Sequence, residues 1–176
     1  MTLSDVLNAT NCDPAKRIGH MRVLFVCVGN ICRSPTAQGV FQALLRKRSL
    51  TDQIESDSAG TTSYHVGEAP DSRSQQAARR RGYDLSAIRS RRLVAADFER
   101  FDLVLAMDSP VLAELRRLCP SAQKEKVHLF MDFSSAYCRA DVPDPYYGGS
   151  DGFERVLDLI ESGAQGVLDA CLANRR

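Results

Sequence analysis

A cysteine and an arginine enclose the segment of this chain whose residue types and spacing are best suited to chemistry. The five residues between Cys27 and Arg33 allow the backbone to curl until successive N–H groups point inward and bind a phosphate-sized anion. The planar fork of Arg33 matches two oxygens of such an anion. Gly29 and Asn30 tolerate the left-handed backbone angles that this curl requires. The predicted phosphate-binding loop comprises Val28, Gly29, Asn30, Ile31, Cys32, Arg33 and Ser34.

Cys27 is the candidate nucleophile of this loop. A thiol near a helix N-terminus and an arginine ionises readily, so we expect Cys27 to be a thiolate that a hydrogen bond from Ser34 steadies. Its attack on a bound phosphate would form a phospho-cysteine intermediate. Because the inward N–H groups and Arg33 would offset the developing charge, no metal and no cofactor are expected. The alternative is that Cys27 is an ordinary buried cysteine of a strand. The nearby Gly29, Asn30, Arg33 and Ser34 disfavour it.

A leaving phenolate requires a proton, and Asp144 in Asp144-Pro145-Tyr146-Tyr147 is the best candidate for the general acid. Pro145 stiffens the backbone beside it, and the surrounding loop over residues 134–150 is long enough to reach another part of the molecule. The same carboxylate would later act as a base and activate water. The alternative is an Asp-Pro turn, which is the commoner role of this dipeptide.

Strand and helix patterns alternate along the chain and position these residues. Continuous apolar runs predict strands at residues 22–28 and 103–107, and two further strands are expected at residues 54–59 and 127–130. Helices are predicted between them and at the C-terminal end, the first with Ser34 as N-cap and Pro35 at its first position. This order predicts an α/β fold, a four-stranded parallel sheet with helices on both faces in a three-layer, flavodoxin-like or Rossmann-like arrangement. Ligands of such folds bind at the carboxyl ends of the strands, where the Cys27 loop lies.

The length of 176 residues suits one domain, which we assign to residues 21–176. Residues 1–20 show no periodicity and are interpreted as an N-terminal extension, either flexible or added to the natural chain, with Met21 as a candidate natural start. Neither a signal peptide nor an apolar run of about 18 residues is found, so no membrane span is expected.

The net charge and the cysteine content limit which partners and which cellular compartment the sequence favours. The net charge of +1 gives no general attraction to nucleic acid. The six cysteines lack zinc-binding spacing, and free thiols in a reducing cytoplasm are the simplest interpretation. One basic stretch stands out, and it is either a solvated helix face or a surface that attracts anionic substrate. Its members are Arg79, Arg80, Arg81, Arg89, Arg91 and Arg92.

Residues 27–35 resemble, almost letter for letter, the nucleophile loop of the low-molecular-weight protein-tyrosine phosphatases, and residues 144–147 resemble the acid loop of that family. Their separation, 144 − 27 = 117 positions, is also similar. The resemblance runs from about Met21 to the C-terminus, with further matches at residues 57–61, 70–73, 101–102 and 107–108. It implies a four-stranded parallel sheet flanked by helices, and hydrolysis of phosphotyrosine in proteins and of small aryl phosphates.

The resemblance also implies roles for individual residues. Cys27 would be the nucleophile, Arg33 would bind phosphate and stabilise the transition state, and Asp144 would be acid and base. Three residues would hold the loop in shape, namely Asn30, Ser34 and Ser58. Three tyrosines would line the substrate cleft, namely Tyr64, Tyr146 and Tyr147. In the family a thiol at the position of Cys32 can trap the oxidised nucleophile as a disulfide. The alternative for Cys32 is a small residue that only fills space in the loop.

Related enzymes leave alternatives open. Arginine phosphatases typically carry Thr where Ile31 stands, so Ile31 favours a protein phosphotyrosine substrate, with inorganic phosphate or a similar oxyanion also fitting the loop. Arsenate reductases need two further cysteines near residues 90–110, where this chain has none.

Departures from the family are Val111 for Asn, Tyr64 for Trp and Arg81 for His. A phosphate-binding or redox-sensing module without turnover is the second hypothesis, although such a binder needs no acid. The sequence names neither a physiological substrate nor an oligomeric state.

Overall fold

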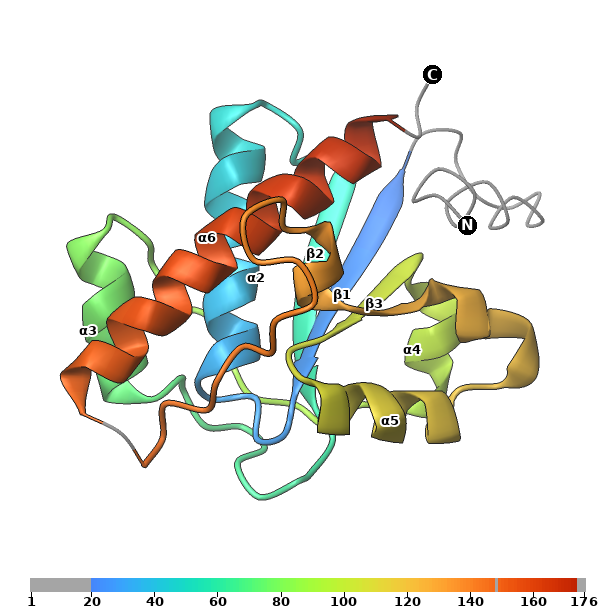
Figure 1. Ribbon diagram of the computed structural model, residues 1–176, viewed down its shortest axis with the longest axis horizontal. Coiled ribbons are helices and arrows are strands. Elements are labelled where there is room, and N and C mark those ends of the chain that lie inside the picture. The colour runs from blue at the N-terminus through green and yellow to red at the C-terminus, as the bar shows by residue number, and fades with distance from the viewer. Residues whose placement is uncertain (1–19, 148, 174–176) are drawn as a thin grey trace.

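The structure is a computed structural model that describes residues 20–147 and 149–173, with a four-stranded parallel sheet at its centre (Figure 1). The sheet has the order β2-β1-β3-β4, and every neighbouring pair is parallel. Its strands are β1 (Met21–Cys27), β2 (Ile54–Gly60), β3 (Leu103–Ala106) and β4 (Val127–Leu129). The four predicted strands are confirmed within one residue at each end. The predicted N-terminal extension lies, except for His20, outside the described residues.

Helices cover both faces of the sheet, as the alternating pattern predicts. Helices α2 and α6 lie on one face with α3 beside them, and α4 and α5 lie on the other (Figure 1). The helices are α2 (Arg33–Lys47), α3 (Ser72–Arg80), α4 (Ala95–Arg100), α5 (Ser109–Leu118) and α6 (Ser150–Ala173), with 3-10 turns η1 (Ser121–Lys126) and η2 (Phe130–Phe133). The short α4 was not predicted, because six residues give too little periodicity.

The first strand is buried on both sides. Val23 and Phe25 face a core shared with α2 and α6, whereas Leu24 and Val26 face a second core shared with α4 and α5. The Phe25 ring packs edge-on against other phenylalanine rings on its side, with a centroid distance of 5.6 Å to Phe130. A strand that points alternate side chains into two cores needs a continuous apolar run, which explains the sequence of β1. Cys27 is the last residue of this strand, so the buried strand fixes the position of its backbone.

The start of α2 differs from the prediction in a way that matters for the loop. The helix begins at Arg33 with Cys32 at the N-cap position, and no side chain caps it. Ser34 is not the N-cap, because its hydroxyl contacts the Cys27 sulfur and the Asn30 amide instead. The first N–H groups of α2 therefore have no side-chain acceptor and are available to an anion.

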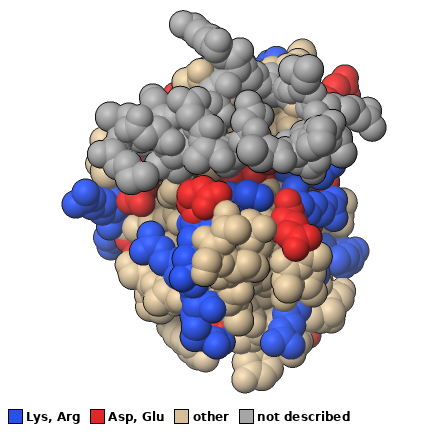
Figure 2. All heavy atoms as spheres, turned by 90° about the vertical axis from the view of Figure 1, so that its right-hand side faces the viewer, with Lys and Arg blue, Asp and Glu red and all other residues tan. Residues whose placement is uncertain are grey.

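The surface carries charges of both signs. On the face shown in Figure 2, basic and acidic side chains are interspersed with uncharged ones. Ion pairs such as Arg117–Glu114 and Arg100–Glu55 connect charges of opposite sign at the surface. Across the described part of the chain, no helix combines the length and apolar character that crossing a lipid bilayer demands.

The close approach of α6 to η2 gives a stability prediction. A Cβ at Gly166 would lie 1.8 Å from the carbonyl oxygen of Phe133. This oxygen belongs to the backbone, so η2 or α6 would have to shift to relieve the clash. We expect Gly166→Ala to lower the free energy of unfolding by about 1–3 kcal/mol in urea denaturation. The matched control is Gly152→Ala in the same helix, whose Cβ would meet its nearest neighbour at 3.7 Å. Equal stability of the two variants would contradict this packing.

Candidate active site

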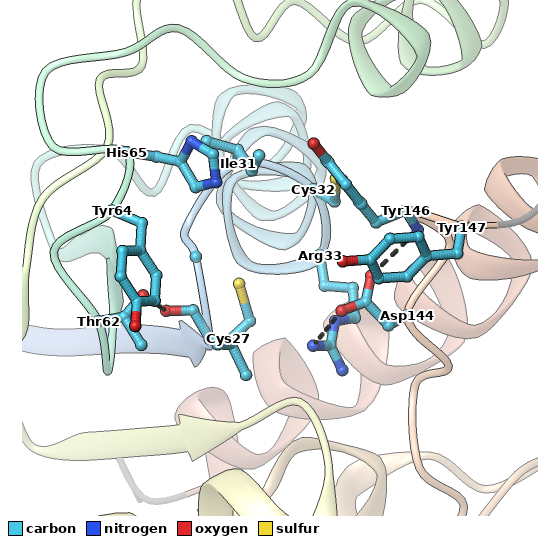
Figure 3. Close-up of a pocket in the computed structure, with 12 residues that line it drawn as sticks. Cys27, Ile31, Cys32, Arg33, Thr62, Tyr64, His65, Asp144, Tyr146 and Tyr147 are labelled. Carbon is cyan, nitrogen blue, oxygen red and sulfur yellow. Dashed lines mark hydrogen bonds and ion pairs between the residues drawn. The ribbon is translucent and has the colours of Figure 1, made fainter.

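A cavity of about 230 Å³ opens at the carboxyl end of β1 (Figure 3). Three segments line it: the predicted phosphate-binding loop, the stretch after β2 and the predicted acid loop. The lining residues are Cys27, Val28, Gly29, Ile31, Cys32, Arg33, Thr62, Tyr64, His65, Asp144, Tyr146 and Tyr147. The structure thus brings the two motifs to one pocket, although they lie more than a hundred positions apart in the sequence.

The Cys27 sulfur lies at the base of this pocket, and two groups contact it. The backbone N–H of Asn30 donates to Sγ at 3.2 Å, and Ser34 Oγ lies 3.0 Å from Sγ. Because Ser34 Oγ also accepts from the Asn30 side-chain amide at 2.9 Å, its own proton can be donated to the sulfur. Two donors that converge on one sulfur suit an anionic nucleophile.

Asn30 holds the loop in its curled conformation. Its backbone has φ of 55°, in the left-handed region. Its side-chain amide donates to Ser34 Oγ and to Ser58 Oγ, each at 2.9 Å, and its carbonyl oxygen accepts from Arg91 N at 2.9 Å. Ser58 Oγ in turn donates to Gln38 Oε1 at 2.6 Å. The structure therefore brings together all three residues expected to support the loop, and it adds Gln38 and Arg91.

The Arg33 side chain is buried and its fork is shared among three acceptors. Nη1 donates to the Asp108 carboxylate and to the Val142 carbonyl, the latter at 3.2 Å. Nη2 donates to Asp144 Oδ2 at 3.1 Å. Burial works to lower the pKa of Arg33, but the negative charges of Cys27, Asp144 and Asp108 outweigh it and raise that pKa above its usual value. Arg33 is a fixed cation at this position.

Asp144 reaches the pocket from the long loop before α6. Val142 is fully buried, and its N–H donates to the Met107 carbonyl at 2.9 Å, which anchors this loop to the end of β3. The Asp144 carboxylate stays about half exposed, and its Oδ1 accepts from Tyr146 N at 3.1 Å. One carboxylate oxygen thus contacts Arg33 while the group remains open to the pocket (Figure 3).

Three tyrosines rim the pocket. Tyr64 lies on one side of the opening, and Tyr146 and Tyr147 lie on the other (Figure 3). Tyr64 and Tyr147 are 82% and 95% exposed, so neither is explained by core packing. The Tyr146 and Tyr147 rings meet edge to face with centroids 5.0 Å apart. Aromatic walls around an anion-binding base suit a flat aryl group.

Sequence reasoning missed several residues of the site. Asp108 caps α5 by accepting from Val111 N at 2.8 Å with one oxygen, while the other oxygen accepts from Arg33. Its place directly before Ser109-Pro110 signals the cap, but nothing local signals the contact with Arg33. His65 lines the pocket beside Gly29, and its Nδ1 lies 2.8 Å from a Glu68 carboxylate oxygen.

Cys32 lies in the loop as a buried thiol. Burial is the main cause that raises its pKa to about 12, so the thiol is protonated at neutral pH. Attack on an oxidised Cys27 would require Cys32 to lose that proton first. Its role as a redox partner stays a prediction.

The basic stretch contains arginines with structural partners. Arg80, the last residue of α3, and Arg81, which follows it, pair with Glu154 of α6 at 2.7 Å each. Arg91 pairs with Asp57 and with Asp97, both at 2.9 Å. These three arginines link elements of the fold, which favours the structural interpretation for them. Among residues 20–147 and 149–173, no group of three His, Cys, Asp or Glu side chains is arranged to hold a metal ion.

The family model for low molecular weight phosphotyrosine protein phosphatases matches residues 22–176. The chain belongs to this family. A putative low molecular weight protein-tyrosine-phosphatase of Synechocystis is 43% identical over 149 residues, which cover 84% of this chain and 94% of that protein. The chain is accordingly a phosphatase of this family, and the structural comparisons agree.

Two crystal structures illustrate the shared fold. A protein tyrosine phosphatase from Entamoeba histolytica with Hepes in the active site has a TM-score of 0.81 at 43% identity, over 85% of this chain and 95% of that one. YfkJ from Bacillus subtilis has a TM-score of 0.85 at 34% identity, over 92% of this chain and 100% of that one. The α/β architecture of this phosphatase is therefore that of solved relatives.

The hydrogen bonds of Asn30 give a prediction on activity. Asn30→Ala removes them and leaves a side chain in the left-handed region, whereas Asn30→Gly removes them and relieves that strain. We expect both variants to lower kcat/KM for p-nitrophenyl phosphate at least about tenfold, because the Asn30 N–H and the Ser34 hydroxyl lose their fixed positions at the Cys27 sulfur.

The matched control is Ser49→Ala, which alters another residue with positive φ (54°) at the C-terminal end of α2. It should cost stability by strain alone and leave kcat/KM unchanged. Full activity of Asn30→Gly would show that the loop needs only the backbone conformation and not the side-chain bonds.

Proposed function

We propose that this phosphatase hydrolyses protein phosphotyrosine, and small aryl phosphates, in two steps through a phospho-cysteine at Cys27, without a metal ion. The observation that carries the proposal is the convergence of a hydrogen-bonded sulfur, a buried arginine and an acidic loop on one pocket. These three groups supply a nucleophile, a phosphate-binding cation and a proton donor.

In the first step, the phosphate of the substrate binds over the sulfur and takes hydrogen bonds from the loop N–H groups and from Arg33. It competes with Asp144 for Nη2 of Arg33, so substrate binding frees the carboxyl group to face the leaving oxygen. The Cys27 thiolate forms the S–P bond as the P–O bond to the phenol breaks. The freed Asp144 carboxylate takes up a proton from solvent and gives it to the departing oxygen, and the products are the phenol and the phospho-enzyme.

In the second step, water hydrolyses the phospho-cysteine. The Asp144 carboxylate, left by the first step, takes a proton from the attacking water. The new P–O bond forms as the S–P bond breaks, which restores the thiolate and yields inorganic phosphate. Throughout both steps, Arg33 and the loop N–H groups offset the charge on the phosphoryl oxygens, and this supports metal independence.

The rim of the pocket supports an aryl phosphate as substrate. Tyr64 and Tyr146 offer apolar ring surface above the anion-binding base, and a phenyl ring can pack against such surface. Ile31 adds an apolar side chain to the lining at the position where phospho-arginine enzymes typically carry Thr. Hepes, found in the active site of the Entamoeba relative, carries a tetrahedral sulfonate, and we infer that the loop of this chain accepts phosphate or similar oxyanions.

We also propose a cytoplasmic location. Cys27, Cys32, Cys119 and Cys138 carry free thiols, and Cys138 is exposed. Such thiols persist where glutathione and thioredoxin keep the compartment reducing. A thiolate nucleophile would also need that environment to escape oxidation.

The role of Cys27 gives the most direct test. Cys27→Ser should lower the turnover of p-nitrophenyl phosphate by about 10⁴-fold or more, because a serine hydroxyl is a far weaker nucleophile here. Mass spectrometry after an acid quench should find one phosphoryl group on Cys27 in the parent enzyme, and EDTA should leave its rate unchanged.

Cys138→Ser, which alters an exposed cysteine outside the pocket, serves as control and should keep full activity. Substantial turnover by Cys27→Ser would refute the phospho-cysteine mechanism.

The role of Asp144 gives a second test that depends on the leaving group. Asp144→Asn should lower kcat/KM for phenyl phosphate by about 10²–10³-fold, because its phenolate must be protonated to leave. The loss on p-nitrophenyl phosphate should be much smaller, since that phenolate is a weak base. Asp141→Asn is the matched control, because Asp141 lies in the same loop but accepts from Ser109 instead. Equal losses on both substrates would rule out a general acid role.

A further inference from the structure

We propose that Arg73 is a positioning residue for the proton transfer, because it ties the loop of Asp144 to the frame that holds the nucleophile. The inference deepens the proposed function and rests on Asp144 being the general acid. Arg73 does not line the pocket, and its side chain is 44% exposed. Its contacts nevertheless lead to both reacting groups.

One end of this connection is the start of α3. Asp71 caps α3, and its carboxylate accepts from Arg73 N at 2.8 Å. The same carboxylate holds the Arg73 guanidinium with two bonds, from Nε at 3.0 Å and from Nη2 at 2.7 Å. A bidentate pair of this kind fixes the plane of the guanidinium and not merely its charge.

The other end is the acid loop. Nη1 of Arg73 donates to the carbonyl oxygen of Tyr146 at 3.1 Å. The guanidinium also lies over the Tyr146 ring at 5.4 Å and over the Phe153 ring at 4.9 Å. The backbone N–H of the same Tyr146 donates to the Asp144 carboxylate at 3.1 Å. Arg73 therefore holds the residue whose N–H orients the acid.

The start of α3 is in turn fixed to the nucleophile loop. The N–H of Asp71 donates to the Ile31 carbonyl at 2.8 Å, and Ile31 lies in the middle of the loop between Cys27 and Arg33. A short path of bonds thus runs from the nucleophile loop through Asp71, Arg73 and Tyr146 to Asp144. This path joins the acid loop to the nucleophile loop in addition to the bonds of Arg33 with Val142 and Asp144, and it remains when a phosphate takes Nη2 of Arg33 from Asp144.

The surface position of Arg73 argues against a mainly stabilising role. The Arg73 guanidinium is 44% exposed and water screens it, so its pair with Asp71, whose side chain is 11% exposed, contributes only modestly to stability. Precise placement of a proton donor matters far more, since a displacement of about 1 Å can cost about 100-fold in rate. Lysine could keep the charge, but it has no planar group to lie flat on two rings while bonding to Asp71 and Tyr146.

The test compares two substrates that differ in their need for an acid. Arg73→Met keeps an apolar stem of similar length and removes the guanidinium. We expect it to lower kcat/KM about tenfold or more for phenyl phosphate and by less than about threefold for p-nitrophenyl phosphate. Arg73→Lys should recover part of the loss, through its remaining bond donors. Inhibition by inorganic phosphate should stay unchanged, because Arg33 and the loop are intact.

A double-variant measurement separates positioning from general damage. In the Asp144→Asn background, Arg73→Met should add no more than about a twofold loss on phenyl phosphate, because no proton donor remains to be placed. Arg80→Met is the matched control, since Arg80 is an exposed arginine of the same helix that pairs with Glu154 and not with the acid loop. Arg80→Met should leave the ratio of kcat/KM for phenyl phosphate to kcat/KM for p-nitrophenyl phosphate unchanged.

Equal losses on the two substrates for Arg73→Met, or the same loss with and without Asp144, would overturn the positioning role. Its failure is distinguishable from failure of the proposed function. If Asp144→Asn shows the dependence on leaving group and Arg73→Met does not, the positioning role alone fails. If Asp144→Asn itself shows no such dependence, the acid assignment fails and the role of Arg73 fails with it.

Discussion

The left-handed turn at Asn30 is the constraint on which the site depends. With φ of 55°, the turn points the Asn30 N–H at the Cys27 sulfur, and the side-chain amide bonds to Ser34 and Ser58. An asparagine suits this position because it tolerates the conformation and supplies the hydrogen bonds that compensate for it. These hydrogen bonds hold the loop in its curled conformation and so reduce the entropy cost of ordering it around an anion.

The rest of the fold provides attachment points for this loop. Strand β1, buried on both faces, sets the position of Cys27, and α2 begins immediately after the loop with Arg33. Strand β3 ends beside it, where Met107 anchors Val142 and Asp108 accepts from Arg33. Because parallel strands end at one edge of the sheet, segments far apart in sequence meet there without a long unsupported loop.

The sequence allowed the strands and the main chemistry to be predicted, because both leave local signals. Continuous apolar runs identified β1 and β3, whereas the largely polar β2 and the short β4 gave weaker signals. The Cys27 loop and the acid motif stood out by residue type and spacing. Asp108 and Arg73 escaped prediction because each acts on a partner more than seventy positions away. The N-cap assignment of Ser34 was wrong because a serine before a proline suggests a cap, whereas tertiary contacts with Cys27 took its hydroxyl.

The shared fork of Arg33 has a consequence for the end of the catalytic cycle. A buried cation that bound inorganic phosphate with no competitor would hold its product tightly and slow each turnover. Once Asp144 has released to solvent the proton that it would take from water, its carboxylate can return to Nη2, so the arginine exchanges one anionic partner for another. Under the proposed mechanism, Asp144 would then serve the release of phosphate from the buried arginine as well as the protonation of the leaving group.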